Sequence, residues 1–103
     1  MNPQFRKGIL EMCVLKLIDR RDMYGFEVIE TLASSIPVTE NTIYPILRRL
    51  TGQNLFETYE TQTNIGAPRK YYRITEAGKR QLGSYEKEWT TFLKGVFDVM
   101  GGN

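Results

Sequence analysis

Most of the side chains that could recognise another molecule lie in one segment, residues 39–53. With a helical period, the apolar residues of this segment fall on one side and the polar residues on the other. Amide, guanidinium and hydroxyl groups can hydrogen-bond to the base edges and phosphates of a DNA duplex. We therefore expect the outward side and its flanks to contact double-stranded DNA through Asn41, Thr42, Tyr44, Pro45, Arg48 and Arg49.

Pro45 distinguishes this surface from an ordinary solvated helix face. It would occupy the sixth position of the helix, where a proline removes a backbone hydrogen bond. In a helix interior, proline costs about 3 kcal/mol relative to alanine. A face that meets only water gains nothing in return, so we expect Pro45 to serve a contact with a partner.

Two adjacent cations, Arg69 and Lys70, form the second candidate site. They follow the turn-forming residues 64–68, and the flanking residues 55–63 and 69–74 alternate with a period near two. This pattern predicts a β-hairpin with a loose tip. The segment around the two cations is the most basic part of a chain whose net charge is only +2. We expect Arg69 and Lys70 to meet a phosphate backbone or a minor groove.

Three helices precede the hairpin and must position both sites. The periodicity of the apolar residues predicts helices over residues 6–20, 24–34 and 39–53. Thr39 is a suitable N-cap for the third helix, and Asn54 suits the left-handed residue that follows it. The second and third helices form a helix-turn-helix, and the hairpin completes a winged version of it.

The first predicted helix carries apolar residues on two sides. One stripe consists of Leu10, Val14, Leu17 and Ile18, and the other of Phe5, Ile9 and Met12. A helix that is apolar on two sides is usually buried on two sides. We expect the first stripe to enter the core and the second to meet another chain or the C-terminal helix.

The C-terminal part is predicted to form a short helix over residues 76–82, a loosened join at Gly83 and Ser84, and a longer helix beyond. Apolar residues recur there at spacings of three and four, as in a heptad seam. The seam consists of Leu82, Tyr85, Trp89, Phe92, Val96 and Val99. Because a small chain has little core to cover such a seam, dimerisation is favoured over packing within one chain. We expect a DNA-binding domain over residues 1–82 and a dimerisation helix over residues 83–103.

Trp89, the only tryptophan, has two interpretations. In the first, it fills the dimer interface as a packed aromatic side chain. In the second, two copies of it face each other and bind a planar aromatic or hydrophobic ligand, with Phe5 and Met12 lining the same space. The sequence leaves both open and identifies no effector.

The composition excludes several classes of chemistry. The chain has 103 residues, no histidine and one cysteine, which excludes histidine-based catalytic or metal sites and an internal disulfide. We expect no enzymatic activity, cofactor or metal ion. The longest apolar stretch, residues 8–18, is too short and too charged to span a bilayer, and the first seven residues lack the order of a secretory signal. The expected compartment is the cytoplasm.

These features favour a mostly α-helical (α+β) fold, a winged helix-turn-helix with a two-stranded wing and a C-terminal dimerisation helix. The favoured function is sequence-specific DNA binding by a transcriptional regulator. The alternative is a winged-helix protein-interaction module that does not bind DNA. An interaction surface would be more apolar than the outward side of residues 39–53 and the basic hairpin, which favours the first interpretation.

Three motifs resemble the PadR family of transcriptional regulators. Residues 42–50, Thr-Ile-Tyr-Pro-Ile-Leu-Arg-Arg-Leu, resemble the family's recognition helix. Residues 66–78, Gly-Ala-Pro-Arg-Lys-Tyr-Tyr-Arg-Ile-Thr-Glu-Ala-Gly, resemble its wing and the helix after it, and residues 23–28 resemble the start of its second helix. The size of the chain is similar to the small subfamily that has one C-terminal helix and includes multidrug-responsive repressors.

This resemblance implies a homodimeric repressor, and a two-fold dimer implies a palindromic operator. In the family, the third helix enters the major groove, and the wing contacts the minor groove or the backbone. The last helix crosses to the partner and packs on its first helix, and the small subfamily can bind aromatic compounds there beside a tryptophan that Trp89 matches in position. Two places depart from the family pattern: Asn54 stands where glycine is usual, and residues 65–67 replace paired glycines.

Overall fold

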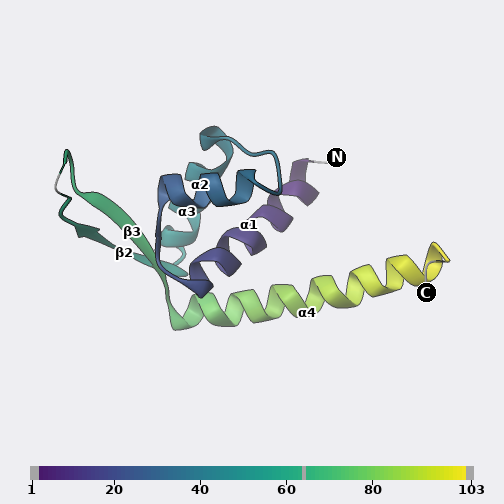
Figure 1. Ribbon diagram of the computed structural model, residues 1–103. Helices are drawn as coiled ribbons and strands as arrows, with labels where there is room; N and C mark the ends of the chain where they lie inside the picture. The colour runs from purple at the N-terminus through teal and green to yellow at the C-terminus, as the bar shows by residue number, and fades with distance from the viewer. Residues whose placement is uncertain (1–2, 64, 102–103) are drawn as a thin grey trace.

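The elements of the chain follow the expected order, with one additional short strand (Figure 1). The computed structural model describes residues 3–63 and 65–101, apart from the side chain of Phe5. Three helices pack together, a hairpin projects from them, and the last helix runs alongside the first and continues beyond it. The elements are α1 (Pro3–Arg20), β1 (Met23–Tyr24), α2 (Gly25–Ala33), α3 (Glu40–Gly52), β2 (Phe56–Thr61), β3 (Arg69–Ile74) and α4 (Glu76–Val99). The predicted winged helix-turn-helix fold is confirmed.

The wing is a three-stranded antiparallel sheet in the order β1-β3-β2, and not the expected two-stranded hairpin. In β1, Met23 pairs with Tyr72 and Tyr24 with Tyr71. Strand β1 was not predicted from the sequence, because two residues are too few to show an alternating pattern. The second helix therefore begins at Gly25 and not at Tyr24, which belongs to the strand.

The hydrophobic core lies between the three packed helices and the sheet. The expected inward stripe of α1 is buried, and so is the expected apolar side of α3. Leu15, which lies outside the expected stripe, is buried as well. The second stripe of α1 is covered only in part, since Ile9 and Met12 are half-buried. The buried residues of α1 and α3 are Leu10, Val14, Leu15, Leu17, Ile18, Ile43, Ile46, Leu47 and Leu50.

The helix α3 begins and ends where the sequence predicts, but the expected hydrogen bond from its N-cap residue is absent. Thr39 is the N-cap residue, but its side chain makes no capping hydrogen bond. Asn54 has a φ of 64°, the left-handed conformation expected after the helix. The amide of Leu55 donates to the carbonyl of Leu50 at 2.9 Å, and the amide of Asn54 donates to that of Thr51 at 3.0 Å. This bond pattern ends the helix and turns the chain into β2.

The last helix is continuous from Glu76 to Val99, so the expected loosened join at Gly83 and Ser84 does not occur. Starting a new helix would require a costly nucleus, whereas one glycine within a helix costs only about 1 kcal/mol. The hydroxyl of Thr75 accepts the amide hydrogen of Gly78 at 3.0 Å and caps the helix as expected. Because the helix crosses residue 83 without a break, the domain boundary after residue 82 stays a prediction.

In the described part of the chain, no helix combines the length and apolar character needed to cross a membrane.

Gly78 sits where α4 presses against the chain entering the wing. A Cβ atom at this position would lie 2.2 Å from the carbonyl oxygen of Leu55 and 2.6 Å from Cγ1 of Ile74. Since a backbone atom cannot move aside easily, only glycine fits there. By contrast, a Cβ at Gly83 on the same helix would meet nothing within 4 Å.

These two glycines make a matched pair for a stability test. We expect Gly78→Ala to lower the free energy of unfolding by about 1–3 kcal/mol, because the added methyl overpacks the contact with Leu55. Gly83→Ala should raise it by about 0.5–1 kcal/mol, because alanine loses less entropy in a helix. Urea unfolding at one protein concentration measures both. Equal losses at the two positions would contradict the role of the contact.

Candidate nucleic-acid interface

The core holds α3 so that one side of the helix points outward. Asn41, Pro45 and Arg48 are exposed on that side, as expected from the sequence. Among the described residues, Arg48 forms no ion pair. Burial raises the pKa of the nearby Tyr72, Tyr44 adds to the rise, and the Arg48 guanidinium opposes it. The positive charge of Arg48 therefore acts on the base of the wing as well as on the outward surface.

Tyr44 joins α3 to the wing and to α2. Its ring lies against Gly25, where a Cβ atom would come within 2.5 Å of the ring carbon Cε1. Tyr44, Gly25, Arg69 and Lys70 help to line one recess of about 190 Å³. The outward side of α3 and the basic hairpin thus share a single surface. The sequence brought them together only through the general pattern of a winged helix-turn-helix. The close approach at Gly25 was missed in the sequence, where the only signal was its place in a recognised motif.

The two wing cations rest on aromatic rings. The guanidinium of Arg69 lies 4.5 Å from the ring centre of Tyr24, and the Lys70 ammonium lies 5.7 Å from that of Tyr72. Alternation along β3 directs the two side chains to opposite faces of the sheet. Both side chains are exposed. The rings hold the cations near the sheet while leaving their charge open to solvent.

A pair of stacked tyrosine rings stiffens the sheet. Tyr59 and Tyr71 are cross-strand partners whose rings stack at 5.6 Å with an interplanar angle of 13°. The hydroxyl of Tyr59 donates to Asp22 at 2.6 Å. This hydrogen bond is the first cause of the raised pKa of Tyr59. The base of the wing is thereby tied to the chain that enters β1.

Arg49 is directed to the interior side of α3, where it pairs with Glu11 of α1. The other carboxylate oxygen of Glu11 accepts the Tyr85 hydroxyl of α4 at 3.3 Å. Burial raises the pKa of Tyr85, and the Glu11 charge adds to the rise. Glu11 therefore links three helices, which the sequence did not reveal. The ion pair competes with any phosphate for the Arg49 guanidinium.

Thr42 lies on the flank of α3 that faces α1 and is half-buried. It lines a groove together with residues from the first turns of α1. Thr42 and Tyr44 thus lie on opposite flanks of the outward side.

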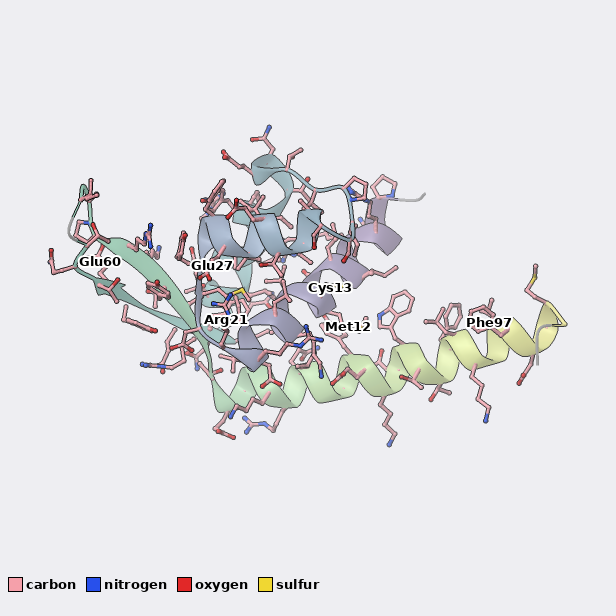
Figure 2. The ribbon with its side chains drawn as sticks, in the orientation of Figure 1. Met12, Cys13, Arg21, Glu27, Glu60 and Phe97 are labelled. Carbon is pink, nitrogen blue, oxygen red and sulfur yellow. The ribbon has the colours of Figure 1, made fainter. Side chains whose placement is uncertain are left out.

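The three residues considered for a ligand are only partly brought together. Met12 lines a groove of about 350 Å³ between α1, the end of α2 and α4, which Glu86 also lines. Trp89 follows Glu86 by one turn of α4, and its ring meets that of Phe92 edge-on at 6.1 Å. The side chain of Phe5 lies outside the described residues. Figure 2 shows Met12 directed from α1 toward α4. Within the described residues, no group of His, Cys, Asp or Glu side chains could hold a metal ion.

Comparison with known proteins places the chain in a family. Residues 14–84 match the model of the transcriptional regulator PadR-like family. The chain is 34% identical over 97 residues to an uncharacterised protein of Lysinibacillus sphaericus, covering 90% of this chain and 88% of that protein.

Solved structures agree with this match. A PadR-like transcriptional regulator from Bacillus cereus shares 33% identity with a TM-score of 0.86, over 97% of this chain and 99% of the other. A PadR family regulator from Eggerthella lenta shares 37% identity with a TM-score of 0.84, over 97% and 88%. The chain therefore belongs to the PadR-like family of transcriptional regulators, as its motifs indicated, and this is not a family of enzymes.

Proposed function

We propose that this member of the PadR-like family is a homodimeric repressor that binds a palindromic operator through α3 and the wing. The observation that carries the proposal is the division of α3 into a buried apolar side and an exposed outward side. The outward side presents Asn41 and Arg48 on a helix that the core prevents from rotating. Lys70 lines the recess beside Tyr44 and so belongs to the same surface.

Each residue of this surface has a role that follows from its chemistry. Asn41 pairs with adenine edges and Arg48 with guanine edges, because these side chains match those donor and acceptor patterns in the major groove. The hydroxyls of Thr42 and Tyr44 bond to phosphates on either side of the helix. Pro45 brings the helix close to the duplex without a long side chain between them.

The wing supplies the electrostatic part of binding. Lys70 and Arg69 meet the phosphate backbone or the minor groove next to the site that α3 reads. Contacts of this kind position the protein but carry no sequence information. Arg49 contributes less than the wing cations, because Glu11 already neutralises it.

The dimer is supported by the distal half of α4. Phe92 is 56% exposed and Phe97 57% exposed, although both are large apolar side chains. In the described chain nothing covers this half, because α4 extends past the end of α1 (Figures 1 and 2). A second copy covers the stripe when its α1 presents the half-buried Ile9 and Met12. A two-fold dimer of this kind reads two half-sites about one helical turn apart, or a multiple of that, and blocks transcription by occupying them.

We also propose an aromatic or hydrophobic effector at the α4 interface. Trp89 is half-buried beside Phe92, and Met12 lines the neighbouring groove. Phe5 belongs to the same stripe of α1 as Met12. An effector held there releases the operator only if it binds the DNA-free arrangement of the two subunits more tightly than the DNA-bound one.

The test of DNA binding starts with selection of bound sequences from random duplexes by the full-length protein. We expect an inverted repeat with half-sites about 10 base pairs apart. On that operator, Lys70→Ala should reduce the slope of log affinity against log salt by about 1.8, which is about 0.9 for each of two phosphates. Arg49→Ala should reduce the slope less, and Lys87→Ala, an exposed lysine of α4, should leave it unchanged.

Asn41→Ala tests whether Asn41 recognises bases or only makes contacts that are independent of the DNA sequence. It should lower the preference for operator over random DNA by about 1–3 kcal/mol. Enrichment of no sequence, together with an affinity that salt does not change, would instead favour a protein-interaction module.

The dimer is tested by placing a charge on the exposed stripe. Phe92→Asp should dissociate the dimer, because an unpaired charge in an apolar interface costs several kcal/mol. Operator affinity should fall with it, since two half-sites can no longer be held together. Sedimentation and operator titration measure the two effects, with Lys94→Asp on the polar side of α4 as the control. A monomeric Phe92→Asp protein with unchanged operator affinity would refute the coupling.

The effector is tested through the single tryptophan. Planar hydrophobic cations or neutral aromatics should quench Trp89 fluorescence and lower operator affinity. Trp89→Ala should weaken their binding, measured by calorimetry, while Trp89→Phe keeps an aromatic ring at the interface. If Trp89→Ala only dissociates the dimer, and the wild type binds no compound from a broad aromatic panel, the residue is a packing residue.

A further inference from the structure

The flank of α3 opposite the wing carries its own positive charge. A groove of about 480 Å³ lies between the first turns of α1 and this flank. Arg6 and Lys7 line it from α1, and Thr42 and Pro45 line it from α3. The sequence pattern assigned no role to these two cations.

Local contacts fix Arg6 while leaving the charge of the groove unbalanced. The Arg6 guanidinium donates to the carbonyl of Pro37 at 2.6 Å, which holds the start of α1 against the chain leading into α3. Lys7 is exposed, and within the described residues neither cation forms an ion pair. Glu40, in the first turn of α3, pairs with neither of them. Arg49 also lines the groove, but its charge is neutralised by Glu11.

The geometry of a duplex explains why cations on both flanks matter. The major groove is about 12 Å wide, and a phosphate backbone runs along each side of it. Thr42 and Tyr44 are two residues apart, so helical geometry separates them by about 200° around α3. If the Tyr44 flank and Lys70 face one backbone, the Thr42 flank faces the other.

We propose that Lys7, with Arg6 and Thr42, forms a second phosphate-binding site for the backbone across the major groove from the wing. The Arg6 guanidinium and the Lys7 ammonium attract the phosphate, and the Thr42 hydroxyl bonds to it. This inference rests on the proposed entry of α3 into the major groove. It adds the start of α1 to the DNA-binding surface and makes that surface two-sided.

The test compares Lys7→Ala with Lys87→Ala. Both lysines are exposed on helices, and neither forms an ion pair within the described residues. Operator affinity of the full-length protein is measured between 50 and 200 mM salt. We expect Lys7→Ala to reduce the slope of log affinity against log salt by about 1.8. Between 50 and 200 mM salt, the affinity of the variant should then fall about twelvefold less than that of wild type. Ethylation interference with wild type should mark phosphates on both strands of each half-site. With Lys7→Ala, the marks on one strand should disappear and those facing the wing should remain.

The outcomes separate this site from the proposed function. If Lys70→Ala reduces the slope and Lys7→Ala behaves as Lys87→Ala does, the second site is refuted while DNA binding stands. If wild type binds no duplex, the proposed function fails first. Dimer dissociation by Lys7→Ala, with no change in slope per subunit bound, would assign the residue to the subunit contact and overturn the proposal. Arg6→Lys keeps the positive charge and should retain most of the slope. Thermal unfolding of this variant tests whether loss of the Arg6 hydrogen bond to Pro37 destabilises the fold.

Discussion

Burial of one side of α3 is the constraint on which the remaining surface depends. Four residues of that helix, Ile43, Ile46, Leu47 and Leu50, are at most 3% exposed. Rotating the helix by one residue would expose part of this set and bury polar groups without partners, which costs several kcal/mol. The orientation of Asn41, Pro45 and Arg48 therefore follows from the core and not from any contact of their own.

Close backbone and side-chain approaches then place the wing and α4 around this helix. The Tyr44 ring against Gly25 sets α3 next to α2 and the wing, and Gly78 lets the start of α4 touch Leu55. Glu11 joins Arg49 of α3 to Tyr85 of α4 through its two carboxylate oxygens. A shift of α4 along α1 would disturb this set of contacts, so the position of α4 is mechanically connected to the surface that α3 presents. The effector that we propose at α4 would act through such a connection.

Charge is distributed so that a nearly neutral chain still presents a basic surface. Ion pairs such as Lys16 with Glu86 and Arg73 with Glu57 neutralise cations away from the outward side of α3. Arg48 and the wing cations remain without carboxylate partners among the described residues, so the net +2 understates the local field. This arrangement suits a polyanionic partner more than an apolar one.

The sequence by itself determined the features that repeat locally. The apolar spacing of α1 and α3, the alternation of the hairpin and the left-handed Asn54 were all predictable, because periodicity and turn preferences are encoded in neighbouring residues. Family motifs identified the class of regulator for the same reason. The roles assigned to single residues in DNA and effector binding stay predictions.

Only the tertiary structure decided the features that join distant segments. The two-residue strand β1 exists because β3 is present to pair with it. The unbroken α4 persists through Gly83 because extending a helix costs less than starting another. The Glu11 bridge, the fit at Gly25 and the cationic groove at Arg6 and Lys7 all bring together residues more than fifteen positions apart. Such contacts depend on how helices pack in three dimensions, and the periodicity of a sequence does not indicate which distant residues come close in space.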